Sequence, residues 1–200
     1  MARILRAEGV PVIDADEIAR EVVLPGAWGH RRLVARFGRK ILNADGTVNR
    51  MYLRSITLGE HGSTQNRRLL NEATHLPIAA RILWLMLRLG VWENHDVVCL
   101  DAPLLFETGM DRLCRLVWVV HCSPATQVLR LMARDGVGKV DAQANIDTQW
   151  PLAKKLAAAD VKISNDGDLA TLRVIVLDAL RHQGGQRPLE GSRHPVVAGR

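Results

Sequence analysis

The chain has 200 residues, of which 48% are hydrophobic and 24% are charged, and its formal net charge is +6. This is the composition of an ordinary globular domain, without low-complexity segments or internal repeats. The basic balance favours an anionic partner, such as nucleic acid, a membrane surface or a phosphate-rich metabolite. The Lys and Arg residues are dispersed with no run of five or more, which argues against a nucleic-acid-binding arm.

Four short apolar runs are predicted to form strands, at residues 10–13, 96–100, 116–121 and 161–164. They are rich in Val and Ile and show little polar alternation, which is typical of strands buried on both faces. Helical patterns separate them, as the β–α–β units of a parallel sheet require. The sequence therefore predicts an α/β fold with a parallel sheet covered by helices.

The helices that alternate with these strands are predicted at residues 1–8, 15–23, 124–134, 141–148, 151–159 and 169–181. Gly9 is expected to stop the first helix. Asp14 is expected to cap the second, because Glu17 follows at the spacing of a capping box. Ser123 followed by Pro124 is a typical helix start.

Two regions depart from the alternation. Residues 25–92 hold several helical patterns and no convincing strand, so we expect a helical insertion over one edge of the core, with Asn49 capping one of its helices. Residues 184–200 contain turn formers without a period, and we predict a disordered tail there.

Localisation signals are weak. Arg3 and Arg6 interrupt the apolar residues near the start, so no signal peptide is predicted. The most apolar helix candidate, residues 82–92, is shorter than the ~20 residues of a membrane span and carries Arg88. Three cysteines without a CxxC pair favour buried thiols in a reducing compartment. We expect a cytoplasmic protein, with an organelle as the alternative.

Polar residues gather where the predicted strands end. The first strand leads into Asp14 and Asp16, the second into Asp101, the third ends at His121, and the fourth leads into Asn165. Ligands of an open parallel sheet bind outside the carboxyl ends of its strands. Carboxylates at such an edge, with cations nearby, fit Mg²⁺–phosphate chemistry or a simple salt-bridge network. Asp14 as a helix cap, Asp16 as a partner of the helix dipole and Asp101 as a turn carboxylate remain open alternatives.

Five segments in order extend this interpretation: VIDADEIAREVV, FGRKILNADGTVNR, LDAPLLFETGMDRL, SPATQVLRLMARDGV and QWPLAKKLAAADVKISNDGDL. Together they closely resemble the dephospho-coenzyme A kinase family of P-loop kinases, from about residue 3 to residue 180. The resemblance implies ATP- and Mg²⁺-dependent phosphorylation of the ribose 3′-hydroxyl of dephospho-CoA, the last step of CoA synthesis. It also implies one domain, residues 1–183, with an acceptor-binding region at about 25–92 and a lid at about 124–159.

Residue by residue, the resemblance implies that Asp16 is the general base for the ribose hydroxyl. Arg20, one helical turn further on, would steady the acceptor substrate. The remaining acceptor-site residues implied are Asp14, His75, Asp101, Leu104, Phe106 and Glu107. Asp101 would also be linked to Mg²⁺. In the lid, Arg134 and Lys155 would offset charge on the migrating phosphoryl group, while Arg130 and Asn165 would contact the nucleotide.

The chain departs from the family pattern at its start. The family begins with a strand and a GxxxxGK[ST] phosphate loop, whereas this sequence begins within the helix that follows them and contains no such motif. We therefore expect the first, central strand to be missing, with a gap of about two strand spacings, each ~4.8 Å. Unpaired groups at that gap would make the chain unstable alone. Without the loop, the main-chain N–H groups and the Lys that hold the β and γ phosphates of ATP would be missing, so we expect impaired kinase activity. A frequent lid Arg is also replaced by Asn145, and the usual His-Pro by His75-Leu76-Pro77.

Two rival functions remain at this point. A relative without turnover would bind dephospho-CoA or CoA through the acceptor site and would lack firm ATP binding. A nucleic-acid binder is the third hypothesis, motivated by the basic charge alone, and we predict no nucleic-acid partner. The oligomeric state is left open. Among the five tryptophans, Trp150 is expected to be the most exposed.

Overall fold

The computed structural model describes residues 1–58, 62–184 and 196–199. The chain divides into two compact units, Met1–Ile13 with Leu89–Arg200, and Asp14–Arg88. Each unit is described in turn. The predicted helical insertion at residues 25–92 overlaps most of the second unit, while the predicted sheet lies in the first.

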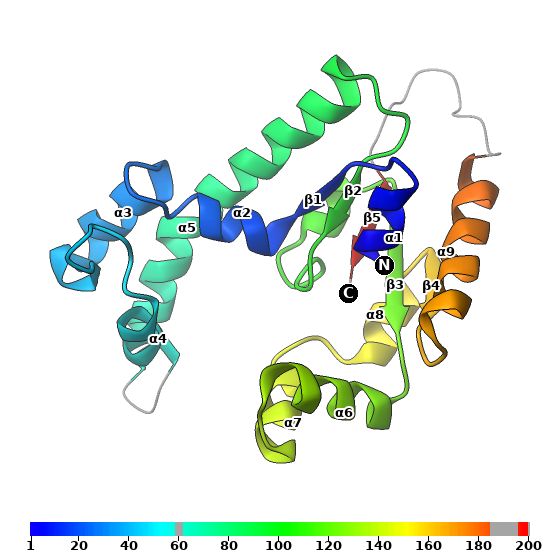
Figure 1. Ribbon diagram of the computed structural model, residues 1–200. Helices are drawn as coiled ribbons and strands as arrows, with labels where there is room; N and C mark the ends of the chain where they lie inside the picture. The colour runs from blue at the N-terminus through cyan, green and yellow to red at the C-terminus, as the bar shows by residue number, and fades with distance from the viewer. Residues whose placement is uncertain (59–61, 185–195, 200) are drawn as a thin grey trace. The chain divides into compact units, whose positions relative to one another are not determined.

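A five-stranded sheet forms the centre of the first unit, in the order β1-β2-β5-β3-β4 (Figure 1). Its strands are β1 Val12–Asp14, β2 Cys99–Asp101, β3 Leu116–His121, β4 Val161–Ser164 and β5 Val196–Gly199. β5 pairs in parallel with both β2 and β3, and β4 pairs in parallel with β3. The prediction of an α/β fold with a parallel sheet is confirmed.

The expectation of a gap in the sheet is wrong, because β5 lies between β2 and β3. Leu116 and Val119 of β3 are in register with Val196 and Gly199, so the pairing extends along the whole of β5. Two strands that faced an empty slot would leave buried peptide groups unpaired, at ~1–3 kcal/mol each. An extended Val-Val segment satisfies those groups. The predicted disordered tail therefore contains a strand, and its residues 185–195 and 200 lie outside the described residues.

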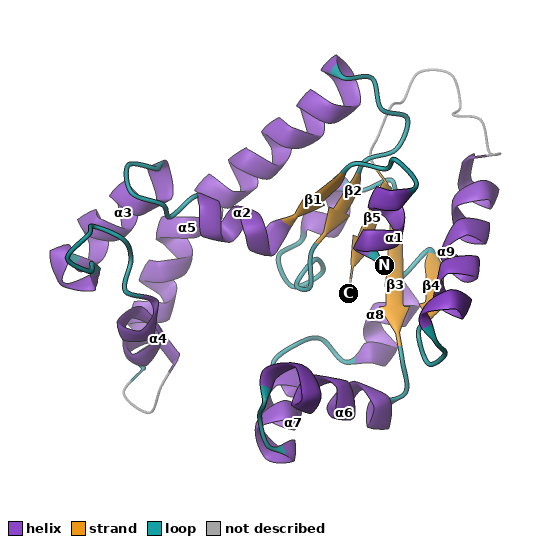
Figure 2. Cartoon of the chain, viewed as in Figure 1, coloured by secondary structure: helices purple, strands orange, loops and turns teal. Residues whose placement is uncertain are grey.

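Helices accompany the sheet of the first unit, some against the strands and some extending away from them (Figure 2). They are α1 Ala2–Ala7, α6 Pro124–Asp135, α7 Lys139–Asp147, α8 Leu152–Ala158 and α9 Leu169–Gly184, with a 3₁₀ turn at Met110–Leu113. α9 contacts β4 and α1, α8 contacts β3, and α6 contacts α7. The predicted start of α6 is confirmed. The Ser123 hydroxyl accepts from the Thr126 N–H, and Gly136 ends the helix at φ +67°.

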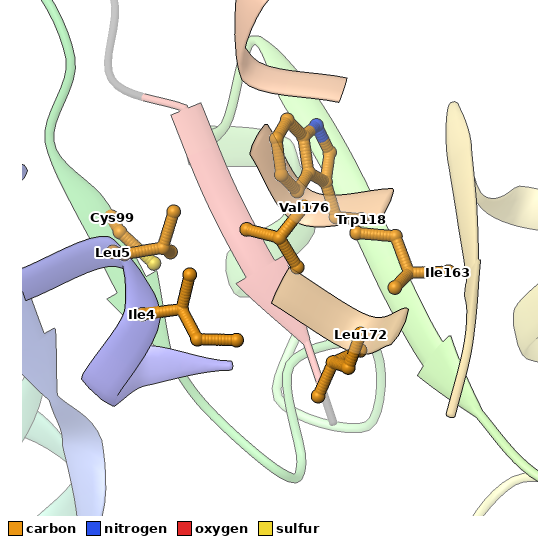
Figure 3. Packing of buried hydrophobic residues seen from close by; sticks show 7 residues of the cluster. All are labelled: Ile4, Leu5, Cys99, Trp118, Ile163, Leu172 and Val176. Atoms are coloured by element: carbon orange, nitrogen blue, oxygen red, sulfur yellow. The ribbon is translucent and has the colours of Figure 1, made fainter. Parts of the chain in front are cut away.

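One apolar cluster holds these elements together (Figure 3). Its members are Ile4, Leu5, Cys99, Trp118, Ile163, Leu172 and Val176. Leu172 and Val176 are four residues apart on α9, so they share the helix face that packs on the sheet. Burying each large apolar side chain contributes ~1.5–3 kcal/mol. The cluster thus joins the early helix α1 to the late helix α9.

The second unit is helical, as predicted. Its helices are α2 Ala15–Glu21, α3 Trp28–Phe37, α4 Arg50–Leu58 and α5 Thr64–Leu87, with a 3₁₀ turn at Arg39–Ile41. α2, α3 and α4 all contact α5. A core of Leu33, Phe37, Ile41, Val48, Leu53 and Ala73 fills the space between α3, α4 and α5. Asn49 accepts the Tyr52 N–H at the start of α4, so its predicted capping role is confirmed.

The long helix α5 begins well before the helix candidate at residues 82–92. It runs through Pro77 without ending and passes into a π-helical turn at Arg88–Trp92. Among the described residues, Thr64–Trp92 is the one helix long and apolar enough to cross a membrane. Core helices of ordinary globular domains meet the same criterion. Its contacts with α2, α3 and α4 give the helix a packing role within the second unit.

Candidate active site

The carboxyl ends of four strands meet at one edge of the sheet, because β2, β5, β3 and β4 run parallel. Asp101 is the last residue of β2, and it is 4% exposed. At the other side of this edge His121 of β3 is in register with Ser164 of β4. Open parallel sheets bind ligands outside this edge. Asp101 therefore stands where the sequence predicted it, at the end of a buried strand.

The loop after Asp101 combines exposed and buried side chains. Leu104 is exposed, whereas Phe106 is buried and stacks on Trp150, with ring centroids 5.7 Å apart and an angle of 11° between the rings. The expectation that Trp150 is the most exposed tryptophan is wrong, because this stacking covers one of its faces and Trp92 is 71% exposed. Lys154 lies over the Trp150 ring, 3.4 Å from its centroid.

Glu107, at the end of the same loop, contacts the segment between α7 and α8. Its Oε1 accepts the Trp150 N–H at 2.7 Å and lies 3.1 Å from the Lys155 ammonium. Burial raises the pKa of Glu107, but hydrogen bonds from the main-chain N–H groups of Trp150 and Glu107 and from Lys155 outweigh it. The net result is a pKa below the ordinary value. Glu107 and Lys155, predicted for different parts of the site, are thus direct partners.

Lys155 has further acceptors. Its Nζ donates to Gln149 Oε1 at 2.8 Å and to the Pro103 carbonyl at 3.3 Å, and the residue is 5% exposed. Gln149 was not among the residues predicted from the sequence. It stands in the segment QWPLAKK quoted for the resemblance, but no local pattern identified its partner, which lies six residues further on.

Arg130 and Asn165, which were predicted to contact the nucleotide, also contact each other. Arg130 Nη1 of α6 donates to the main-chain carbonyl of Asn165 at 2.6 Å, just after β4. The Asn165 N–H in turn donates to the His121 carbonyl at 2.7 Å. Asp166 follows Asn165 in the chain, and a hydrogen bond from the Ser123 N–H lowers its pKa. The start of α6 and the loop after β4 therefore form one hydrogen-bonded corner.

Arg134 lies one turn further along α6, in a different environment. Its guanidinium makes two hydrogen bonds to the carboxylate of its neighbour Asp135, at 2.7 and 2.9 Å, and both side chains are on the surface. These bonds lower the pKa of Asp135. Both Arg130 and Arg134 are exposed, so their guanidinium groups are accessible to an anion from solvent.

In the second unit, Asp14 caps α2. Its Oδ1 accepts the Asp16 N–H at 3.0 Å and the Glu17 N–H at 3.1 Å, which confirms the cap interpretation. Asp16 and Arg20 are exposed and four residues apart, so they share one face of α2. His75 is exposed on α5. Asp14, Asp16, Arg20 and His75 therefore belong to the second unit, and the other predicted site residues belong to the first.

Asp101 is the residue of this site that could be a ligand of a divalent cation. Among the described residues there is no group of three or more His, Cys, Asp and Glu side chains that could hold a metal ion. Mg²⁺ in nucleotide sites is held by one or two carboxylates together with substrate phosphates and water. A single carboxylate at a strand end fits that mode of binding.

A parallel sheet with a carboxylate at a strand end, together with helices that carry Arg, fits the fold of the P-loop kinases, a class of phosphotransferases. Comparison with known proteins agrees. The family described as dephospho-CoA kinase matches residues 1–171. The chain therefore belongs to the dephospho-CoA kinase family, whose members catalyse the last step of CoA synthesis.

Individual relatives support the assignment. The dephospho-CoA kinase of Shouchella clausii is 38% identical over 180 residues, covering 90% of this chain and 89% of the relative. That of Arabidopsis thaliana is 39% identical over 198 residues, covering 98% of this chain and 79% of the relative. The solved dephospho-CoA kinase of Campylobacter jejuni is 26% identical, with a TM-score of 0.69 over 92% of this chain and 91% of that one. The structure of TT1252 from Thermus thermophilus shares the fold, with a TM-score of 0.76, 24% identity, and coverage of 95% of this chain and 90% of that chain.

Proposed function

We propose that this chain itself carries out the reaction of its family. The ribose 3′-oxygen of dephospho-CoA attacks the γ-phosphorus of ATP, the bond from that phosphorus to the β,γ-bridging oxygen breaks, and ADP leaves. The family match over residues 1–171 carries the proposal, because every site residue named above lies within that range. The strand-end position of Asp101 is its structural support.

In this proposal the carboxylate of Asp16 accepts the proton of the attacking hydroxyl. Asp16 is exposed in the first turn of α2, and the hydrogen bonds from the Asp16 and Glu17 N–H groups to Asp14 fix the start of that helix. The cap thus holds the main chain of the base in place. Arg20, on the same helix face, would bind an anionic part of dephospho-CoA. His75, Leu104 and Glu107 are proposed as further acceptor contacts.

The proposed nucleotide contacts come from the first unit. Arg130 and Asn165 would contact ATP at the corner between α6 and β4, where the Arg130 guanidinium already reaches the Asn165 carbonyl. Arg134 would offset charge on the transferring group. Asp101 would supply one carboxylate to Mg²⁺, which when bound neutralises phosphate charge.

The role of Asp16 is tested by Asp16→Asn, with Glu17→Gln as a matched control in the same helical turn. Loss of a general base costs ~10²–10⁴-fold in turnover. We expect that loss for Asp16→Asn, with dephospho-CoA affinity retained, and near-normal turnover for Glu17→Gln. Turnover of Asp16→Asn equal to that of the unaltered chain would refute the assigned role.

Calorimetry separates catalysis from binding without turnover. Heat from both ATP and dephospho-CoA, together with ADP release, supports the kinase. Heat from dephospho-CoA alone, without ADP release, supports the alternative hypothesis of a non-catalytic CoA-binding protein. We further propose the cytoplasm as the compartment, because three cysteines without a CxxC pair are typical of a reducing compartment.

A further inference from the structure

The ammonium of Lys155 is fully engaged within the protein. A lysine ammonium has three N–H donors. Three acceptors surround it, namely Gln149 Oε1 at 2.8 Å, Glu107 Oε1 at 3.1 Å and the Pro103 carbonyl at 3.3 Å. The side chain of Lys155 is 6% exposed. In this arrangement no N–H of Lys155 is left for a substrate phosphate.

The three acceptors come from two segments that are distant in the sequence. Pro103 and Glu107 belong to the loop that follows Asp101, and Gln149 belongs to the segment between α7 and α8. Lys155 itself lies on α8, which packs on β3. Its position on a helix fixed to the sheet makes it a rigid point to which both segments are attached.

Two other contacts join the same segments. The Trp150 N–H donates to the Glu107 oxygen that faces Lys155, at 2.7 Å, and the Trp150 ring stacks on Phe106. A carboxylate oxygen that accepts from both a main-chain N–H and an ammonium holds its position more firmly than one with a single donor. The contacts of Glu107, Trp150 and Lys155 thus form one network between the loop after Asp101 and the lid.

We propose that Lys155 is a positioning residue, which holds the loop after Asp101 against the segment between α7 and α8 and does not contact the transferring phosphoryl group. This inference rests on the proposed function for its catalytic consequence. It changes the role that the family resemblance implied for Lys155. The conformation of the loop from Asp101 to Glu107 then depends on Lys155 of α8. Through this loop, the binding of the acceptor substrate depends on the lid.

The network is tested directly by hydrogen exchange of the Trp150 amide, measured by NMR on the full chain. Lys155→Met removes the ammonium and keeps the length of the side chain. We expect the Trp150 amide to exchange at least ~10-fold faster in this variant, because Glu107 loses the partner that orients it. Lys154→Met is the matched control, since Lys154 contacts only the ring of Trp150 among these groups. An unchanged exchange rate in Lys155→Met would overturn the proposal.

A conservative variant keeps the test decisive if Lys155→Met does not fold. Lys155→Arg retains a cation that can reach Glu107, and Glu107→Gln keeps the shape of its partner. We expect slow Trp150 exchange in Lys155→Arg and faster exchange in Glu107→Gln. Equal rates in the two variants would count against a network held by the ion pair.

Kinetics then distinguishes positioning from catalysis. If Lys155 acts through Glu107, the double variant Lys155→Met/Glu107→Gln loses no more turnover than the worse single variant, and KM for dephospho-CoA rises in all three. If Lys155 contacts the phosphoryl group, the losses in kcat multiply, and the proposal fails. Absence of turnover in the unaltered chain would refute the proposed function alone, because the exchange measurement does not depend on activity.

Discussion

Asp101, the last residue of β2, is in register with Ala198 of β5. β5 also pairs with β3 on its other side, so it is the strand that joins the β1–β2 half of the sheet to the β3–β4 half. The candidate cation ligand therefore lies beside the strand on which the continuity of the sheet depends. This relationship makes the stability of the first unit sensitive to residues 196–199.

Val197→Pro tests that dependence. Proline removes a main-chain donor and is poorly tolerated inside a sheet. We expect a loss of ~1–3 kcal/mol in the free energy of unfolding, which lowers the melting temperature by about 2–12 °C for a chain of this size. The control is Ser192→Pro, outside β5. Equal melting temperatures for both variants and the unaltered chain would show that β5 does not stabilise the sheet.

The agreement between the predicted and the observed bounds differs from strand to strand. β3 and β4 have the predicted bounds, because every residue of each strand is paired with a neighbouring strand. β1 and β2 are shorter and lie further along the chain than predicted, since only part of each apolar run is paired. β5 was missed because four residues show no periodicity, and its pairing depends on a slot formed by distant strands.

The candidate site was predictable where chain order alone brings residues to a strand end, as for Asp14 and Asp101. It was not predictable where a contact joins remote segments. Glu107 and Lys155 were both named, but no sequence pattern pairs residues so far apart, and Lys155 was expected to face the phosphoryl group. Its burial follows from the packing of α8 on β3, which only the tertiary structure supplies.

The cap of α2 gives a second prediction. Asp14→Ala removes the acceptor of two main-chain N–H groups, and loss of an N-cap costs ~0.5–2 kcal/mol. Asp16→Ala leaves the cap intact and changes an exposed side chain, for which the expected cost is within ~0.5 kcal/mol. Urea unfolding of both variants checks this difference. A larger loss for Asp16→Ala than for Asp14→Ala would contradict the assignment of the cap.

The thiol of Cys114 gives a third prediction. Burial, helped by the negative charge of Asp111 and by the neighbouring Cys99, raises the pKa of Cys114 to about 12, and its Sγ donates to the Met110 carbonyl at 3.0 Å. Only the thiolate is nucleophilic, so at pH ~8 the Cys114 side chain stays in its unreactive thiol form. We expect Cys114 to resist alkylation in the folded protein and to react quickly in urea, as followed by mass spectrometry. Rapid labelling of Cys114 without denaturant would show that its surroundings are open to solvent.

The ionisation of Glu107 gives the last prediction. Its pKa is lowered in the folded protein, because hydrogen bonds from Trp150, from its own main chain and from Lys155 outweigh the effect of burial. Ionised Glu107 therefore stabilises the fold above the pKa that it has in the unfolded chain, and this contribution disappears as the pH falls through the lower, folded pKa. Glu107→Gln lacks it at every pH and leaves Lys155 without its carboxylate. We expect urea unfolding at pH ~7 to show a loss of ~1–3 kcal/mol in Glu107→Gln, shrinking as the pH falls below the ordinary carboxylate range. In the control Glu17→Gln, which alters an exposed carboxylate, the difference should stay small throughout. A difference for Glu107→Gln that persists unchanged into acid would mean that the charge of Glu107 does not stabilise its contacts with Trp150 and Lys155.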